Sequence, residues 1–103
     1  MLSPSLFSPQ AWQDALDIVA YIADDNVSAA ERFVPAVQDT CTQLVALPSL
    51  GSARTFGRAD LSGVRVMPVT GFENYLIFYV ATKRSITVLR ILHAARDFPT
   101  IFE

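Results

Sequence analysis

The sequence predicts an α+β fold, in which a two-helix antiparallel hairpin packs on a mainly antiparallel sheet of three to four strands. The first half of the 103-residue chain holds two stretches with apolar residues at helical spacing. The second half holds three runs rich in β-branched and aromatic residues. The links between these runs, residues 70–74 and 82–85, are too short for a crossover helix, so the strands must be antiparallel. The expected order is β-α-α-β-β-β plus a short C-terminal segment, in one domain over residues 1–103.

The first elements are a short strand and an amphipathic helix. Residues 2–7 predict a strand, which Pro4 confines to the edge of the sheet. Ser8 followed by Pro9 is typical of a helix start, because the hydroxyl caps the first turn and proline is tolerated there. The helix should end near Asp24, with four polar residues off its apolar face, namely Gln13, Asp14, Asp17 and Asp24. The apolar stripe itself comprises Trp12, Ala15, Leu16, Val19, Ile22 and Ala23.

The second helix is predicted from a capping box and a second stripe. Ser28 with Glu31 three residues later matches the capping-box pattern. Pro35 is a misfit, because an interior proline costs about 3 kcal/mol, so we expect a bend there or a later start of the helix. Pro48 and Gly51 should end the helix. Its stripe comprises Ala30, Phe33, Val34, Val37, Cys41 and Leu44.

Three strands should follow a long loop over residues 50–63 that carries two arginines. The runs 64–69, 75–81 and 86–92 form the strands. The run 75–81 is apolar on both faces, so it should be the central strand with both faces covered. Pro68 predicts a bulge or an unpaired stretch near the end of the first run.

Composition points to a binding partner. Hydrophobic residues make up 51% of the chain and charged residues only 17%, against about 25% in an average soluble protein. A domain this small has a large surface relative to its volume, and this chain has few charged residues to place on it. We therefore expect some apolar surface to remain exposed for a partner. Formal charges give residues 1–50 about −5 and residues 51–103 about +3. The positive half suits an acidic partner segment or a nucleic-acid-bound target, but it lacks the dense basic face of a protein that binds nucleic acid directly.

Cysteine and histidine usage excludes several classes of site. One cysteine, Cys41, and one histidine, His93, do not suffice for a disulfide framework or a zinc cluster. No phosphate-binding loop or other cofactor motif is present, so no cofactor or metal is expected. Cys41 lies on an apolar helical face and is expected in the core of a cytoplasmic protein. The sequence shows no secretory signal and no run of about 20 apolar residues that would span a membrane.

The candidates for chemistry are all in the second half of the chain. They are Arg65, Arg90, His93 and Arg96. Arg90 lies within an apolar strand, where a guanidinium needs a partner, so a structural ion pair with Asp97 or Glu73 is as consistent with the sequence as a functional role. His93 follows the last strand, where a hydrogen-bonded structural role is the alternative to a functional one. No nucleophile–base pair with a supporting signature is present.

The order of motifs resembles the RelE/ParE superfamily of bacterial toxins, most closely the ParE branch. The resemblance spans nearly the whole chain and rests on Ala30-Glu31-Arg32-Phe33, Leu44 through Pro48 to Leu50-Gly51, Gly63-Val64-Arg65, Tyr75-Leu76-Ile77-Phe78-Tyr79, and the ending His93, Arg96, Asp97. It implies a RelE/ParE-like fold and the toxin of a type II toxin–antitoxin system. Such a toxin poisons DNA gyrase without catalytic residues of its own, and a ParD-like antitoxin neutralises it in a hetero-oligomer.

Two other functions remain open. RelE-type relatives cleave mRNA in the ribosome, using cations on the sheet, an arginine after the last strand and a tyrosine near the C-terminus. Arg65 and Arg96 match cationic positions, but Leu76 stands where the central strand would carry an arginine, and Phe102 stands where the tyrosine would be. Phenylalanine cannot transfer a proton and leucine cannot neutralise phosphate, so the ribonuclease site looks dismantled. The other open function is that of a non-toxic protein with the same fold that only binds its antitoxin.

The resemblance and the charge pattern together suggest two binding surfaces. The expected target contacts are Arg65, Arg90, His93 and Arg96, with a mobile tail over residues 98–103. An antitoxin helix would lie in an apolar groove, because helix-in-groove recognition uses apolar anchors at helical spacing. The anchors, where they are not core, would be Trp12, Leu16, Val19, Phe33 and Val37.

Overall fold

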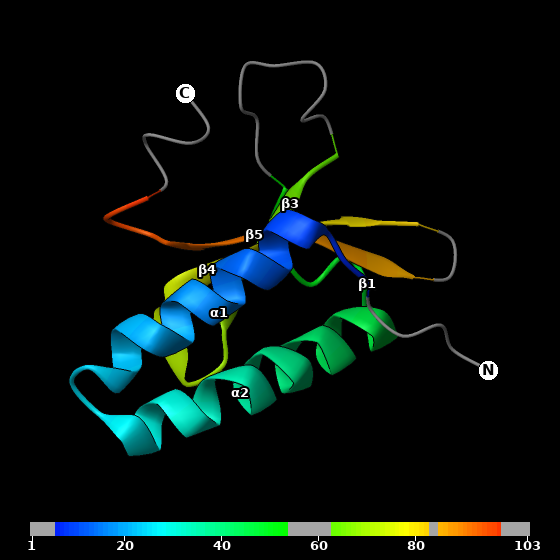
Figure 1. The fold of residues 1–103 in the computed structure, drawn as a ribbon. Helices are drawn as coiled ribbons and strands as arrows, with labels where there is room; N and C mark the ends of the chain where they lie inside the picture. Colours follow the sequence, from blue (N-terminus) through cyan, green and yellow to red (C-terminus); the bar gives the residue numbers. More distant parts are fainter. Residues whose placement is uncertain (1–5, 54–62, 83–84, 98–103) are drawn as a thin grey trace.

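The computed structural model describes residues 6–53, 63–82 and 85–97. Figure 1 shows the two helices as a hairpin lying along one side of a sheet, as the sequence predicted. The elements, in chain order, are β1 (Leu6–Phe7), α1 (Pro9–Ala23), α2 (Val27–Ala46), β2 (Ser52–Ala53), β3 (Arg65–Val69), β4 (Phe72–Ala81) and β5 (Ile86–His93). The strand order in the sheet is β1-β5-β4-β3-β2, so β4 occupies the centre, as predicted.

The meander β3-β4-β5 is antiparallel, and each edge of the sheet gains a two-residue strand. β1 joins β5 in parallel, with Phe7 opposite Val88, which confirms the predicted edge strand at its end. The first part of that prediction, residues 2–5 with Pro4, lies outside the described residues. β2 pairs antiparallel with β3, with Ser52 opposite Val66. β2 lies within residues 50–63, which we expected to be a loop. Residues 54–62 of that segment lie outside the described residues.

The β3–β4 hairpin is tighter than the sequence predicted. β4 begins at Phe72 instead of Tyr75, because the turn contains only Thr70 and Gly71. Gly71 has φ +85°, a conformation that glycine adopts without a steric penalty. The pairing register shifts between Pro68 and Val69, which confirms the irregularity predicted from the proline.

The helix starts are fixed by side-chain caps. The Ala11 N–H donates to Ser8 Oγ at 3.0 Å, and Pro9 occupies the first turn, as predicted. The predicted cap of the second helix was wrong: the Ala29 N–H donates to Asn26 Oδ1 at 3.0 Å, so α2 begins two residues before the position that the capping-box pattern implied. Asparagine and serine cap almost equally well, so the pattern alone did not decide between them.

Pro35 lies inside α2 without ending it. The helix runs from Val27 to Ala46, so the predicted later start was wrong, while a bend stays a prediction. Pro35 is exposed, so water can hydrate the carbonyl of Glu31 that lacks its usual N–H donor.

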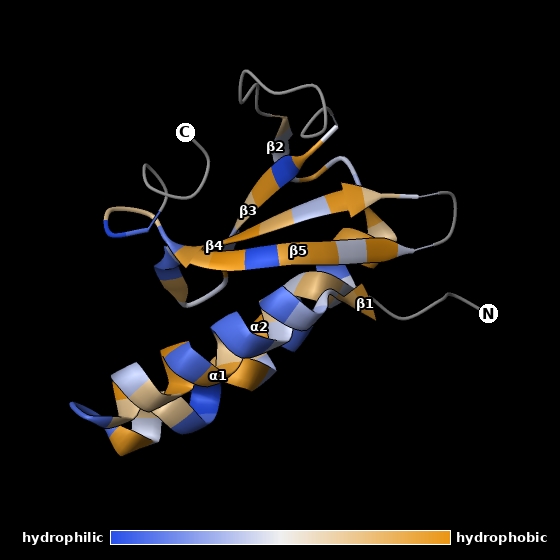
Figure 2. Cartoon of the chain, turned by 45° about the horizontal axis from the view of Figure 1, so that its top comes forward, coloured by the Kyte–Doolittle hydropathy of each residue, from blue (hydrophilic) through white to orange (hydrophobic). Residues whose placement is uncertain are grey.

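Buried side chains form a cluster on each face of the sheet. The larger cluster lies under the helices and contains Phe33, Ile77, Tyr79 and the buried Cys41, which confirms the cysteine as a core residue. The second cluster comprises Val64, Val66, Phe78 and Leu92. Figure 2 accordingly shows β4 and β5 as mainly hydrophobic strands. Phe78 on the second face of β4 is buried and Leu76 and Val80 are half-buried, so both faces of the central strand are at least partly covered, as its sequence predicted.

The buried face of α1 differs from the predicted stripe. The buried residues are Ala11, Asp14, Ala15 and Ile18. Trp12 and Leu16, two members of the predicted apolar stripe, are 54% and 60% exposed, whereas Asp14, predicted to lie off that stripe, is only 7% exposed. The sheet thus contacts an arc of α1 that is rotated from the one with the largest apolar side chains. Within the described part of the chain, no helix is long and apolar enough to cross a membrane.

Candidate functional site beside the edge of strand β5

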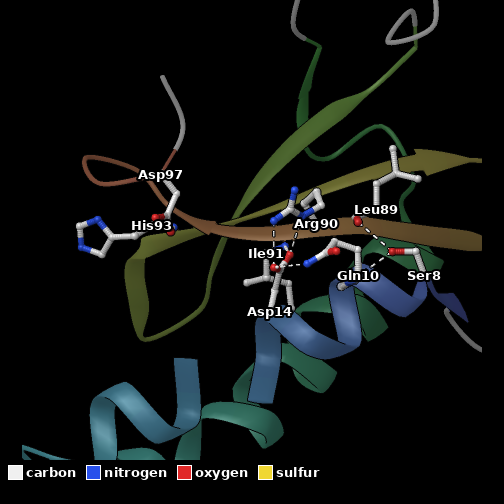
Figure 3. A network of polar contacts seen from close by, with 9 residues as sticks. Ser8, Gln10, Asp14, Leu89, Arg90, Ile91, His93 and Asp97 are labelled. Atoms are coloured by element: carbon white, nitrogen blue, oxygen red, sulfur yellow. Dashed lines mark hydrogen bonds and ion pairs between the residues drawn. The ribbon is translucent and has the colours of Figure 1, made fainter. Parts of the chain in front are cut away.

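The outer edge of β5 is closed by side chains instead of a full neighbouring strand. β1 covers only the beginning of β5. Beyond it, Ser8 Oγ donates to the carbonyl of Leu89 at 2.8 Å, and the Ile91 N–H donates to Asp14 Oδ2 at 3.0 Å (Figure 3). An unpaired strand edge would otherwise invite pairing with another chain. The start of α1 therefore completes the hydrogen bonding of this edge.

Asp14 also holds Arg90 in a two-pronged ion pair. Arg90 Nε lies 2.8 Å from Asp14 Oδ2, and Arg90 Nη2 lies 3.0 Å from Asp14 Oδ1. The side chains of Arg90 and Asp14 are 21% and 7% exposed. The partners expected from the sequence, Asp97 and Glu73, were wrong, because the packing of α1 against β5 brings a carboxylate from 76 residues away. The prediction that Arg90 needs a partner was right.

A tight turn follows β5 and is organised around His93. The backbone N–H groups of Ala95 and Arg96 both donate to His93 Nδ1 at 3.2 Å, and the Asp97 N–H donates to the His93 carbonyl at 3.0 Å. The His93 N–H in turn donates to Asp97 Oδ2 at 3.0 Å. Partial burial raises the pKa of Asp97, but the His93 N–H and the Arg96 guanidinium outweigh it and hold that pKa below its ordinary value. His93 thus has the structural role that we gave as the alternative.

Arg96 projects from this turn and is held by several side chains. Its Nε lies 3.3 Å from Asp97 Oδ1, and its Cζ lies 4.5 Å from the centre of the Tyr21 ring on α1. Partial burial lowers the pKa of Arg96, but hydrogen bonding to Asp97 and Tyr75 raises it above its ordinary value. The guanidinium therefore stays protonated. The side chain remains 42% exposed and available for contact.

A cleft of about 300 Å³ lies between α1, the end of β5 and this turn. Its polar lining consists of Asp14, Asp17, Tyr21, Arg90, Arg96 and Asp97.

Three of the four predicted target-contact residues, Arg90, His93 and Arg96, therefore lie at one end of β5. Sequence reasoning missed Asp14 and Tyr21; the one available signal was the unpaired charge of Arg90 within an apolar strand. Among the described residues, no group of three His, Cys, Asp or Glu is placed to hold a metal ion.

Arg65, the fourth predicted contact, lies elsewhere. It belongs to β3, which β4 separates from β5, and its Nη1 donates to the Gly51 carbonyl at 2.7 Å. Beside it, Tyr79 Oη donates to the Pro48 carbonyl at 2.8 Å and accepts from the Gly51 N–H at 2.9 Å. Burial raises the pKa of Tyr79, although Gly51 and Arg65 oppose that rise. Arg65 thus secures the chain between α2 and β2.

The predicted antitoxin anchors divide into surface and core. Trp12 and Leu16 are exposed and Val19 is half-buried, and these three residues lie on one side of α1 at helical spacing. Phe7 stacks on Trp12 with ring centres 5.4 Å apart. We call Trp12, Leu16 and Val19 the apolar flank of α1. Phe33 and Val37 are 0% and 2% exposed, so they belong to the core and offer no surface to a partner.

Comparisons with known proteins agree with this architecture. A chain of the chromosomal ParDE TA system from P. aeruginosa matches with a TM-score of 0.67 and 18% identity, over 87% of this chain and 95% of that chain. A chain of the heterotetrameric YoeB-YefM toxin–antitoxin complex from Staphylococcus aureus matches with a TM-score of 0.54 and 15% identity, over 87% of this chain and 93% of that chain. These likenesses support the predicted RelE/ParE-like fold.

The family itself is shown by sequence. Comparison with curated proteins gave no match. The family model described as ParE toxin of type II toxin-antitoxin system, parDE, matches residues 6–98, which is nearly the whole chain. The resemblance on which the sequence prediction rested is thereby confirmed. The chain belongs to the ParE toxin family of type II toxin–antitoxin systems.

Proposed function

We propose that this ParE-family toxin inhibits DNA gyrase in the cytoplasm by binding and not by catalysis, and that a ParD-like antitoxin neutralises it in a hetero-oligomer. The observation that carries the target site is the exposed guanidinium of Arg96, held by Asp97 and Tyr21 at the mouth of the cleft. An immobilised, exposed arginine suits contact with a carboxylate or a DNA phosphate at a gyrase–DNA complex.

The other three predicted target contacts, Arg90, His93 and Arg65, are less available to bind a target because their polar groups already have partners within the protein. The charge of Arg90 is compensated by Asp14, and His93 Nδ1 already accepts two backbone hydrogen bonds. Arg65 is half-buried and its Nη1 donates to backbone carbonyls. We therefore assign the leading role to Arg96, with Arg90 and His93 shaping its surroundings.

The alternative ribonuclease function has less support. Leu76, which stands where RelE-type relatives would carry a sheet arginine, packs against the second hydrophobic cluster. Leu76 therefore has a packing role, whereas cleavage of a phosphodiester would need a cation at this position. Phe102, the other departure, and the tail over residues 98–103 lie outside the described residues.

Replacing Arg96 by alanine should reduce gyrase poisoning at least tenfold, on the order of one charge-assisted hydrogen bond. The measurement is the toxin concentration that gives half-maximal protein-linked, cleaved plasmid DNA with purified gyrase and ATP. Arg32→Ala is the matched control, because Arg32 is exposed on α2, its side chain donates to Ser28 Oγ at 2.8 Å, and it does not line the cleft. Equal activity of R96A and wild type would contradict the assigned contact.

The same assay on the unmodified protein tests the target. Accumulation of cleaved complexes supports gyrase poisoning, whereas unchanged supercoiling and no cleavage at micromolar toxin would overturn it. In that case, cleavage of mRNA on translating ribosomes would indicate the ribonuclease alternative. Inactivity in both assays, with antitoxin binding intact, would indicate the non-toxic protein that only binds its antitoxin.

Antitoxin binding should depend on the apolar flank of α1. Trp12→Ala and Leu16→Glu are each expected to weaken binding of the ParD-like antitoxin at least tenfold, because exposed aromatic and aliphatic anchors dominate helix-in-groove interfaces. Both residues are more than half exposed, so we expect a small change in stability for Leu16→Glu and a loss of about 1 kcal/mol for Trp12→Ala, which removes the stacking on Phe7. Val27→Glu is the control, since Val27 is 63% exposed at the start of α2. Titration calorimetry would measure the dissociation constants, and unchanged values for both variants would place the antitoxin elsewhere.

A further inference from the structure

Arg96 is held by contacts within its own turn, by a side-chain hydrogen bond with Tyr75 on β4, and by a residue of α1. Within the turn, its N–H donates to His93 Nδ1 at 3.2 Å and its Nε lies 3.3 Å from Asp97 Oδ1. From α1, the Tyr21 ring lies against the guanidinium, with 4.5 Å between Cζ and the ring centre. The turn contacts hold the backbone and one edge of the guanidinium. The ring, with Cζ of Arg96 lying over it, restricts the rotation that an isolated arginine side chain retains.

Folding does not account for the position of Tyr21. Its side chain is 60% exposed and does not belong to either hydrophobic cluster. It lines the cleft together with Asp14, Asp17 and Ile18 of the same helix. Within the described part of the chain, its ring contacts the guanidinium of Arg96.

We propose that Tyr21 is a positioning residue, which holds Arg96 in the orientation that contacts the target. This inference rests on the proposed role of Arg96. An arginine that is immobilised before binding loses less conformational entropy on contact, so the ring raises potency without touching the target. Arg96 lines the cleft and its side chain stays 42% exposed while the Tyr21 ring lies against it.

The test compares Tyr21→Leu with Tyr21→Phe. Leucine keeps apolar bulk but has no π face, whereas phenylalanine keeps the ring and loses only the hydroxyl. We expect Y21L to raise the half-maximal toxin concentration in the gyrase cleavage assay by about two- to fivefold, the range of an exposed cation–π contact. Y21F should match the wild type. The free energy of unfolding, followed in urea, should be the same in all three proteins because Tyr21 is largely exposed.

Two further readouts separate positioning from a general structural effect. In NMR spectra, the side-chain protons of Arg96 should be shifted upfield by the ring in the wild type and Y21F, and this shift should disappear in Y21L. In the R96A background, Y21L should cause no further loss of potency, because the residue through which Tyr21 acts is gone.

The outcomes distinguish this inference from the proposed function. Loss of potency in R96A with wild-type potency in Y21L would overturn the positioning role and leave the target contact intact. The same conclusion would follow if Y21F were as impaired as Y21L, or if Y21L impaired R96A further. Wild-type potency of R96A would overturn the target contact itself, and the role of Tyr21 with it.

Discussion

Replacing Asp14 by alanine is expected to lower the free energy of unfolding by about 3–5 kcal/mol, the usual effect of removing one partner of a buried ion pair. Four hydrogen bonds disappear together: two from the Arg90 guanidinium, one from the Ile91 N–H and one from Gln10 Nε2. What remains is a largely buried, unpaired charge next to an unpaired backbone donor. The cost therefore comes mainly from the groups left behind and not from the carboxylate that is removed.

The comparison variant is Asp17→Ala on the same helix. Asp17 is exposed and accepts a hydrogen bond only from the neighbouring Gln13 among the described contacts, so its loss should change stability by no more than about 0.5 kcal/mol. Urea unfolding followed by circular dichroism measures both. A double-mutant cycle with Arg90→Met should show strong coupling, because removing both charges avoids the unpaired guanidinium. A D14A protein as stable as D17A would show that the ion pair contributes nothing.

Replacing Gly51 by alanine should destabilise the fold by about 3 kcal/mol, at the upper end of overpacking effects. An added Cβ would lie 2.5 Å from Tyr79 Oη, 2.7 Å from Tyr79 Cε1 and 2.9 Å from the Val66 carbonyl oxygen. The ring is buried and the carbonyl belongs to the sheet backbone, so neither can move away cheaply. Moving Tyr79 would also break its hydrogen bonds to Pro48 and Gly51.

Gly71→Ala separates lack of space from backbone strain. Gly71 has φ +85° and no atom within 4 Å of an added Cβ, so its substitution should cost only about 1 kcal/mol through strain. In addition, Tyr79→Phe should relieve part of the clash, so G51A/Y79F should be more stable than the sum of the single effects predicts. The midpoints and slopes of urea unfolding give the free energies of unfolding of G51A, G71A, Y79F and G51A/Y79F. Additive effects would mean that Gly51 and Tyr79 do not compete for the same space.

The parts of the fold that local patterns control were predictable. Ser8 and Pro9 defined the start of α1, and Pro68 correctly predicted the irregularity in β3, because capping and the missing proline N–H act within a few residues. The residues of β4, apolar on both faces, correctly predicted a central strand. The two-residue strand β2 was not predictable, since its pairing depends on β3 and not on its own sequence.

The contacts of α1 show where sequence reasoning fails. Apolar residues occupy a wide arc of this helix, so periodicity alone did not decide which part of the arc meets the sheet. The sheet contacts the side that includes Ala15 and Ile18, and the larger Trp12 and Leu16 are left on the surface. Asp14 is buried because Arg90 and a free strand edge face it, and both are features of a segment 76 residues away.

The candidate site was predictable only in part. Arginines near the end of the last strand are visible in the sequence, and three of the four predicted target contacts do lie together. Which of them keeps an exposed charge depends on tertiary partners. Arg65 proved to be engaged with Gly51, and Tyr21, which lies against Arg96, had no local signal at all.

The position of β5 in the fold has a consequence for biosynthesis. β1, α1 and β4 all pack against this strand, yet it is the last element of the described chain to be made. The ribosome adds the residues from the end of α1 at Ala23 to the end of β5 at His93 in roughly 4–14 s, at about 5–20 residues per second. During that interval the helices have no completed sheet to cover. The nascent toxin can therefore assemble its cleft only after β5 and the turn that follows it have been synthesised.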